Sequence, residues 1–315
     1  MNQKQINYFD RLVKSTENFS GIMIHELRTP FNGISGVHQL LEDKLSDSEA
    51  QSANKTNISI AQKLPEIFSG IIRKAETESP GNVQDTFLDL ICRCRKYFKK
   101  QIETLLENTS YLKKHMPDDI TTLSMAETCI EKITSIMNTI LLYNDIRNGD
   151  LKLVPGQVDI RNLLNELTNN MQNQAAEKNL QMNISIENDV PEVLIGDAVR
   201  IEQILSNIIN NAIEFTQKGR IDVLVTTEKN ANNNPELRIA ITDTGIGIAP
   251  TDLKMVFLPF TQVVTWQHHS RGQGLGLPIA RGLAELMGGS IELMSQFGRE
   301  TTVTVAIPLQ IPASR

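Results

Sequence analysis

Apolar residues recur every three or four positions over residues 16–45, which is the spacing of one face of an α-helix. They are Phe19, Met23, Leu27, Pro30, Ile34, Val37 and Leu41, at successive spacings of 4, 4, 3, 4, 3 and 4. Such a seam packs against partner helices, so we expect a core-forming helix that Ser15 or Thr16 caps. Pro30 removes one backbone donor, which predicts a kink near residues 26–30.

A second seam with the same spacing lies further along the first half of the chain. Its members are Ile120, Leu123, Ile130, Ile133, Met137 and Ile140. Asp118 or Asp119 suits the start of this helix, and Arg147-Asn148-Gly149 suits its end. The two helices are expected to form an antiparallel hairpin. A single hairpin has a thin core, and two hairpins together make a four-helix bundle.

Residues 46–117 separate the two seams and are longer than a hairpin connection needs. They contain a weakly periodic stretch, 49–77, that includes Pro65, a turn at 79–82 and a stronger helical pattern over 84–115. We interpret 46–117 as a helical insertion that extends the hairpin or packs beside the bundle. The basic side of its last helix is either a solvated face or a docking surface for an acidic partner; its residues are Arg93, Lys96, Lys99 and Lys100.

The pattern changes at residue 151 to strands that alternate with helices. Strands are expected at 151–154, 180–187, 220–227, 237–242, 291–295 and 301–307, and helices at 159–178, 197–215 and 274–287. This order predicts an α/β sandwich with helices on one face of a mixed sheet. We therefore expect two domains, a helical one over 1–150 and an α/β one over 151–315.

Composition narrows the class of protein. The 315 residues carry a net charge of −6, with 40% hydrophobic and 22% charged residues, which is ordinary for a soluble globular chain and gives no basic footprint for nucleic acid. No apolar run is long enough to span a membrane, and the N-terminus lacks the apolar core of a secretion signal. The three cysteines have no metal-site spacing and are expected to be free thiols of a cytoplasmic protein.

Two glycine-rich segments of the second half have patterns that suit ligand binding. Asp243 follows a predicted strand and precedes Gly245 and Gly247, where a backbone without side chains can approach a ligand and the carboxylate can accept from an amino group. A tight turn is the alternative interpretation. Residues 272–277, Gly-Gln-Gly-Leu-Gly-Leu, open a predicted helix, and helix N-termini attract phosphate.

Two further groups of polar residues lie on predicted helices. Asn207 and Asn211 are four positions apart on one face, and amide oxygens suit Mg²⁺. His25 stands beside the first seam, where a structural role is the simpler interpretation. Glu26 follows it and can accept an imidazole proton, while Thr29 lies on the same face as His25.

Together these segments resemble the catalytic core of the sensor histidine kinases of two-component signalling. Residues 25–30 resemble the phosphoacceptor box and 196–216 the asparagine box; 243–247, 257–260 and 272–277 resemble the first glycine, phenylalanine and second glycine boxes. The order is that of the family, and the resemblance covers about 1–45 and 118–310. The spelling is most like that of hybrid kinases, although no receiver domain is visible.

The resemblance implies a fold and an activity. The first domain would be a dimerisation and histidine phosphotransfer domain, with a homodimer forming the four-helix bundle. The second would be a Bergerat-type ATP-binding domain, shared with gyrase and the ninety-kilodalton heat-shock chaperones. The chain would phosphorylate itself from ATP and pass the phosphoryl group to an aspartate of a response regulator. It would be either a short cytoplasmic kinase or the cytoplasmic part of a longer protein.

The resemblance also implies a role for each site residue. His25 would be the phosphoacceptor, Glu26 its general base, and Thr29 the residue that orients water in dephosphorylating the regulator. Asp243 would bind the adenine amino group, and Asn211, with Asn207, would hold Mg²⁺ on ATP. The remaining nucleotide-binding residues implied are Gly245, Gly247, Phe260, Gly272, Gly274, Leu275 and Gly276, with residues 257–273 as a lid.

Two other classes of function stay open. A hydrolytic ATPase of the gyrase and chaperone type usually has a glutamate where Asn207 stands, and an amide cannot act as a base. A catalytically silent scaffold is the second alternative, because Glu214 replaces a usual lysine, Leu258 a usual glutamate and Glu300 a usual glycine. Elsewhere we expect His38 on the helix surface and Trp266, His268 and His269 in the lid. Deleting 46–117 is expected to leave nucleotide binding intact.

Overall fold

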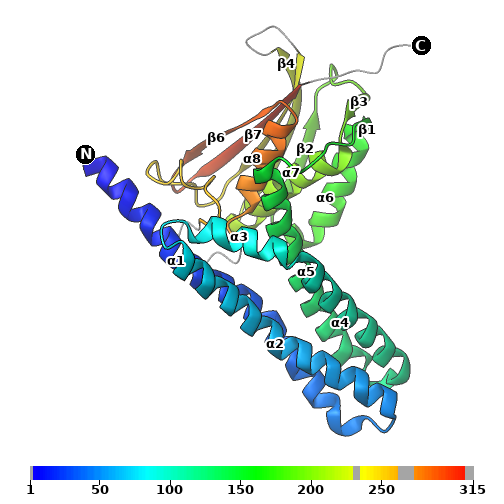
Figure 1. The fold of residues 1–315 in the computed structure, drawn as a ribbon. Coiled ribbons are helices and arrows are strands. Elements are labelled where there is room, and N and C mark those ends of the chain that lie inside the picture. The colour runs from blue at the N-terminus through cyan, green and yellow to red at the C-terminus, as the bar shows by residue number, and fades with distance from the viewer. Residues whose placement is uncertain (1–2, 230–234, 262–272, 309–315) are drawn as a thin grey trace. The chain divides into compact units, whose positions relative to one another are not determined.

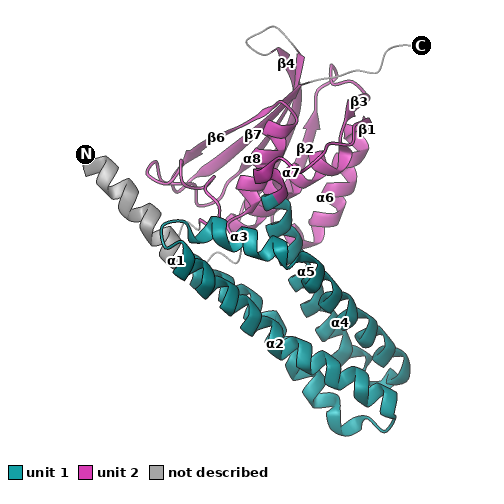
Figure 2. Ribbon diagram, viewed as in Figure 1, with its two compact units in different colours: residues 1–144 teal, residues 145–315 magenta. Residues whose placement is uncertain are grey.

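A computed structural model describes residues 3–229, 235–261 and 273–308, with side chains described from Phe19 onward. The chain divides into two compact units, Met1–Asn144 and Asp145–Arg315, shown in separate colours in Figure 2. Each unit has its own buried core, and the two are described in turn.

The first unit is entirely helical (Figure 1). Its helices are α1 (Gln3–Leu41), α2 (Ser48–Glu78), α3 (Val83–Arg93), α4 (Arg95–His115) and α5 (Ile120–Asn148), with 3₁₀ turns at Glu42–Lys44 and Pro117–Asp119. The expected helices are therefore present, with differences at their ends. The first helix begins at Gln3, so that Ser15 and Thr16 lie inside it and do not cap it. The expected helix over 84–115 is two helices, because the backbone breaks at Cys94.

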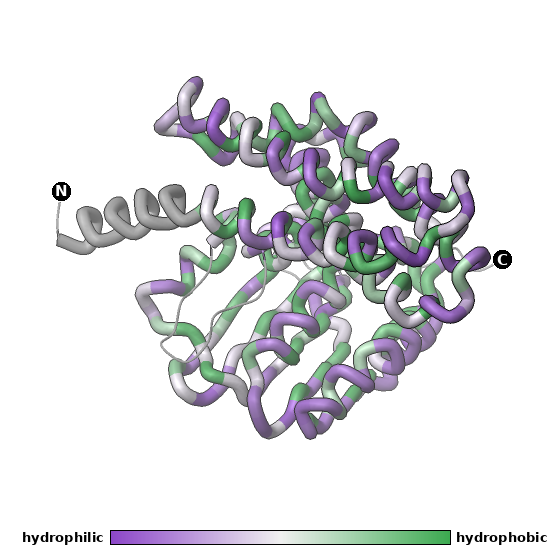
Figure 3. The backbone as a smooth tube through the Cα atoms, turned by 90° about the horizontal axis from the view of Figure 1, so that it is seen from below, coloured by the Kyte–Doolittle hydropathy of each residue, from purple (hydrophilic) through white to green (hydrophobic). Residues whose placement is uncertain are grey.

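Both predicted seams are buried in this unit. The first seam is covered from Phe19 to Leu41, and of the second only Ile120 is exposed. Hydrophobic and hydrophilic stretches alternate along each of these helices in Figure 3, as expected for helices with one buried face. Pro65 lies inside α2 without ending it, and the Ser69 hydroxyl donates to the Pro65 carbonyl at 2.8 Å.

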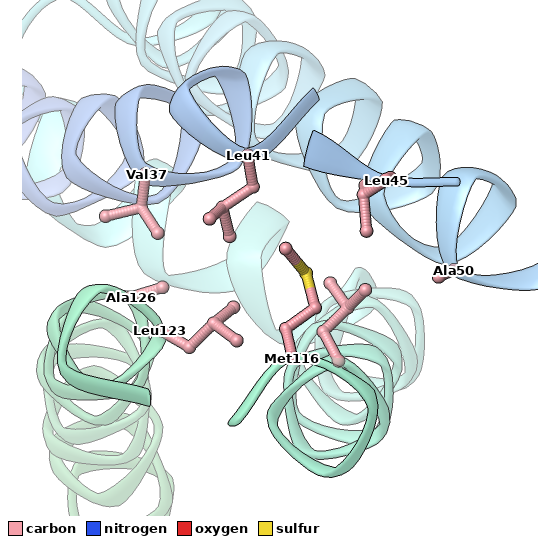
Figure 4. Close-up of a cluster of buried hydrophobic side chains, with 8 residues drawn as sticks. Val37, Leu41, Leu45, Ala50, Met116, Leu123 and Ala126 are labelled. Atoms are coloured by element: carbon pink, nitrogen blue, oxygen red, sulfur yellow. The ribbon is translucent and has the colours of Figure 1, made fainter. Parts of the chain in front are cut away.

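One cluster of side chains shows how the helices meet at one end of the unit. Figure 4 shows apolar residues of α1, α2, α5 and the two connecting turns pointing toward one another. The cluster consists of Val37, Leu41, Leu45, Ala50, Leu112, Met116, Leu123 and Ala126. The segment between the two seams thus contributes to the same core as the seams themselves.

The expectation that His38 lies on the helix surface is wrong, since the side chain is fully buried. Its Nδ1 lies 2.7 Å from Asn54 Oδ1, and its Nε2 lies 3.1 Å from Asn57 Nδ2. The amide oxygen can only accept and the amide nitrogen can only donate, so the ring is neutral with its proton on Nδ1. Asn57 also donates to the Thr109 hydroxyl at 3.1 Å, which extends the network to α4.

The second unit is an α/β sandwich. Its strands are β1 (Gly156–Asp159), β2 (Gln181–Ile186), β3 (Val193–Gly196), β4 (Arg220–Lys229), β5 (Pro235–Asp243), β6 (Ser290–Gln296) and β7 (Glu300–Pro308). Its helices are α6 (Ile160–Glu177), α7 (Ala198–Phe215) and α8 (Gly276–Leu286). The main sheet has the order β2-β4-β5-β7-β6, parallel only between β2 and β4, while β1 and β3 form a separate antiparallel pair.

The main sheet has one apolar and one polar face. In β4 and β5 the buried positions alternate along the strand, as at Ile221, Val223 and Val225, and the three helices cover that face (Figure 1). The mixed sheet with helices on one face is confirmed. The strand expected at 151–154 is wrong, because the extended segment begins at Gly156, and β3 had not been expected.

Candidate functional site

Asp243 ends β5 and is the most perturbed acid of the second unit. The side chain is buried, and its Oδ1 accepts a 2.9 Å hydrogen bond from the Gly245 backbone N–H. Burial raises the pKa of Asp243 to about 6, although the Gly245 N–H opposes that shift. A carboxylate this costly to bury is a candidate for ligand recognition.

The buried Thr216 hydroxyl lies close enough to Asp243 to lower the pKa of that carboxyl. Among the described residues the same hydroxyl has no hydrogen-bond partner of good geometry. A buried polar group without a partner is costly. Asp243 and Thr216 therefore place an acceptor and a hydroxyl side by side, where a ligand could pair with both.

The glycines after Asp243 are required by close packing. A Cβ on Gly245 would lie 2.5 Å from the Phe215 carbonyl oxygen and 2.6 Å from Asp243 Oδ1. Gly247 has a φ of +62°, and a Cβ there would collide with the Gln296 carbonyl. The loop after β5 can therefore follow this path only with glycine at both positions.

Asn207 and Asn211 come together with the start of α8. Both side chains are partly exposed on α7, and a Cβ on Gly276 would lie 3.7 Å from Asn211 Nδ2 and 3.8 Å from Asn207 Oδ1. Gly276 opens α8, where free backbone N–H groups favour anions. The two side-chain amides thus lie beside the N–H groups that open α8, and their oxygens together with those N–H groups suit a magnesium–phosphate ligand.

No group of three or more His, Cys, Asp or Glu side chains gathers as a metal site in the portion of the chain that the structure describes. A divalent cation at the α7–α8 site would therefore be held through the amide oxygens of Asn207 and Asn211 together with ligand oxygens. That donor set is hard and sparsely charged, which fits Mg²⁺ bound on a polyphosphate.

Phe260 and Gly274 anchor the two ends of the segment that was expected to be a lid. The Phe260 backbone N–H donates to the Gly274 carbonyl at 2.9 Å, and both residues have positive φ angles of +57° and +66°. Phe260 and Leu275 are buried, so the Phe260 ring and the Leu275 isobutyl group are fixed by their packing. Gly272, Trp266, His268 and His269 lie outside the described residues.

Lys178 is a cation near the site that the sequence did not indicate. Its Nζ donates to the carbonyls of Ile213 at 2.7 Å and Glu214 at 3.0 Å, at the C-terminal end of α7. The charge complements the helix dipole beside Glu214, the residue that replaces the usual lysine. Lys178 follows α6, so no spacing within the asparagine box could have revealed it.

His25 is the exposed member of the helical unit's candidate site. Its side chain is 78% exposed, and Nδ1 lies 3.9 Å from Glu26 Oε1, while Lys132 Nζ of α5 lies 3.9 Å from Glu26 Oε2. The Thr29 hydroxyl donates to the His25 carbonyl at 3.0 Å. The imidazole is thus open to a reactant, with the Glu26 carboxylate on the Nδ1 side and Lys132 near that carboxylate.

Part of the second unit matches a known family of domains. Residues 196–311 match the family model described as histidine kinase-, DNA gyrase B- and HSP90-like ATPase. The crystal structure of full-length ShkA in complex with AMPPNP superposes with a TM-score of 0.61 at 23% identity, covering 72% of this chain and 47% of that one. At that identity the match shows the fold alone.

Curated relatives extend the similarity to the helical half. GacS of Pseudomonas protegens, a sensor histidine kinase, is 28% identical over 93% of this chain and 32% of its own length. The sensor histidine kinase RcsC of Escherichia coli is 35% identical over 65% of this chain and 21% of its length, and the signal transduction histidine-protein kinase BarA of the same organism is 33% identical over 60% and 21%. The chain thus spans about a fifth to a third of these relatives.

Residues 196–311 therefore match an ATPase domain of the histidine kinase, gyrase B and HSP90 type. The similarity to sensor histidine kinases extends over as much as 93% of the chain, at 28% identity to GacS. None of the described helices combines the length and apolar character needed to cross a lipid bilayer.

Proposed function

We propose that this chain is the catalytic core of a two-component histidine kinase. It binds ATP with Mg²⁺, phosphorylates His25 and passes the phosphoryl group to an aspartate of a response regulator in the cytoplasm. The observation that carries the proposal is the pairing of a buried acid, Asp243, with the amide pair Asn207 and Asn211 against the start of α8. The ShkA structure, a relative in fold, contains the ATP analogue AMPPNP.

Nucleotide binding would use the second unit. The Asp243 carboxylate accepts from the adenine amino group, and the Thr216 hydroxyl beside it offers a second polar contact. Asn207 and Asn211 direct amide oxygens at the cation, which neutralises phosphate charge when bound, and the N–H groups that open α8 bind phosphate oxygens. Gly245 and Gly247 let the loop backbone follow the ligand without side-chain interference.

Phosphoryl transfer would use His25 and Glu26. The imidazole Nε2 attacks the γ-phosphorus, the bond from phosphorus to the bridging oxygen breaks, and that oxygen leaves with the electron pair as ADP. The proton on Nδ1 passes to Glu26, whose carboxylate lies on that side of the ring. Lys132 lies near the second oxygen of that carboxylate.

Thr29 would act in the hydrolytic dephosphorylation of the regulator. It lies one turn after His25, and its hydroxyl lone pairs can orient water for hydrolysis of the regulator's aspartyl phosphate while its proton stays bonded to the His25 carbonyl.

Isotope transfer separates this function from the two alternatives. With γ-labelled ATP and Mg²⁺, the wild-type chain should take up acid-labile label, and His25→Gln should take up none while still binding ATP. Release of inorganic phosphate without labelled protein would identify a hydrolytic ATPase instead. ATP binding with neither label nor phosphate release would identify a silent scaffold.

A further inference from the structure

From Leu123 onward, the apolar seam of α5 is covered within a single chain. The side chains from Leu123 to Ile140 that form it are at most 3% exposed. Two helices alone leave half of each apolar face open to water, so a hairpin of α1 and α5 cannot account for this burial. Something else in the same chain must supply the remaining half of the core.

Each of the long helices contacts two others, which makes a closed ring. The Ser20 hydroxyl of α1 donates to Glu76 of α2 at 2.6 Å, and the rings of Phe68 in α2 and Phe98 in α4 stack with centroids 4.4 Å apart. Lys113 at the end of α4 forms an ion pair with Glu127 of α5. The ring closes between α5 and α1, where Cys129 Sγ would lie 2.6 Å from a Cβ on Gly33.

The same contacts give the direction of each helix. His38, near the end of α1, bonds to Asn54, near the start of α2, whereas Ser20 bonds to Glu76 near the end of α2, so these two helices are antiparallel. Neighbours around the rest of the ring are antiparallel as well. Hence α2 and α4 form a hairpin that lies against the hairpin of α1 and α5, with α4 parallel to α1 and α2 parallel to α5.

Little apolar surface remains for a second chain. Along the described side chains of the helical unit, Phe19–Asn144, the large exposed apolar residues are Leu40, Tyr97, Ile120 and Met125. They are scattered over three helices and form no continuous stripe. A stable dimer buries roughly 800 Å² on each partner, mostly around a compact apolar centre.

We propose that residues 48–115 take the place of a second subunit's hairpin, so that the phosphoacceptor bundle closes within one chain and His25 is phosphorylated in cis by a monomer. The bundle closure stands on packing alone; the cis reaction also rests on the function proposed above. The bundle is asymmetric, because the α2–α4 hairpin, which takes the second subunit's place, carries no histidine except His115 at the very end of α4. One bundle therefore holds one phosphoacceptor, where two hairpins of the α1–α5 type would hold two.

The molar mass of the intact chain tests the closure without reference to activity. Light scattering should give about the 35.2 kDa of one chain, and the midpoint of thermal unfolding should not change when protein concentration is raised a hundredfold. A mass of two chains with a midpoint that rises with concentration would overturn the proposal.

Mixing two inactive chains tests the cis reaction. His25→Gln lacks the phosphoacceptor and Asn211→Ala lacks the proposed metal ligand, so neither should label itself with γ-labelled ATP, and the mixture should stay unlabelled. Label on His25 of the Asn211→Ala chain would show transfer between chains and overturn the cis proposal. If wild type itself takes up no label, the kinase function fails, while the mass measurement still decides the closure.

Discussion

Gly276 lies against the Asn211 amide, with the position of an added Cβ 3.7 Å from Asn211 Nδ2. The distance is an ordinary van der Waals contact, so one methyl group is tolerated there. Anything larger would fill the space between the amide pair on α7 and the N–H groups that open α8. The glycine therefore keeps open the space in which phosphate oxygens would meet both.

Gly276→Val should weaken ATP binding at least tenfold, about 1.4 kcal/mol, because its methyl groups occupy that space. The thermal midpoint should change little, since the atoms nearest the Cβ position belong to the partly exposed side chains of Asn207 and Asn211, at ordinary contact distances. Gly156→Val is the matched control, because no atom lies within 4 Å of its Cβ position and it stands in β1, outside the candidate site. Titration with a fluorescent ATP analogue measures both; equal affinities in the two variants would contradict the proposed phosphate site.

Asp243→Asn should stabilise the second unit and weaken ATP binding at the same time. The pKa of Asp243 is raised from 3.8 to about 6, so the folded state binds the proton more tightly than the unfolded chain. The stabilisation that this proton gives is complete below pH 3.8 and is lost as pH rises through 6. At pH 7.5 the ionised carboxylate thus costs up to about 3 kcal/mol, which the neutral amide avoids while still accepting from Gly245. Differential scanning calorimetry should show a higher midpoint for the variant at pH 7.5, and the difference should shrink as pH falls through 6 and nearly vanish below pH 3.8.

The same carboxylate predicts a pH dependence of nucleotide affinity. Wild-type affinity should fall as pH drops below 6, because a protonated Asp243 is a weaker acceptor for an amino group. The ATP phosphates also titrate in this range, so the ratio of wild-type to Asp243→Asn affinity is the quantity to follow. A ratio that stays constant from pH 5 to 8 would argue against an adenine contact.

His38 makes the helical unit sensitive to acid. Burial lowers its pKa below 6.5, although the bond to Asn54 opposes that shift. The unfolded chain therefore binds the proton more readily, and the stability present above pH 6.5 is lost as pH falls through the lowered pKa. Urea unfolding followed by helical circular dichroism should show this loss. It should be absent in His38→Gln, which keeps a polar side chain but cannot titrate.

Glu26→Gln should slow autophosphorylation by roughly 10²- to 10⁴-fold, the usual contribution of a positioned base, without changing ATP affinity. Glu76→Gln is the control, since it removes one negative charge from an exposed position on α2, where Glu76 accepts from Ser20. Initial rates of label uptake distinguish the two. An equal, small effect in both would show that Glu26 acts through overall charge and not as a proton acceptor.

The seams of α1 and α5 could be predicted because each has a full apolar period, whereas their partners could not. Which helices cover a seam depends on contacts such as the Phe68–Phe98 stack. These two residues lie on different helices, and their positions in the sequence do not indicate that they are in contact. His38 was misplaced for the same reason, because its burial depends on Asn54 and Asn57 on another helix.

The strands and helices of the α/β unit could be predicted more fully from the sequence, except for the pair β1 and β3. Its longer strands alternate visibly, but β1 and β3 have four residues each, too few for a period, and they are extended because they pair with each other. Among the residues of the candidate site, the glycines could be identified from their sequence motifs. Thr216 and Lys178 acquire their positions next to Asp243 and Glu214 only from the folded chain.

The polar network at His38 would make the self-closed bundle selective for its own α2–α4 hairpin over hairpins of other proteins. A cell with several homologous kinases contains many similar apolar seams, and apolar packing by itself discriminates poorly between them. Here the competing hairpin is tethered at a high effective concentration and must also satisfy a buried imidazole with two amides in register. A hairpin from another kinase would leave those buried polar groups without hydrogen bonds. Mixed oligomers of two different kinases are therefore disfavoured for two reasons, the tethering of the chain's own hairpin and the cost of the unpaired groups.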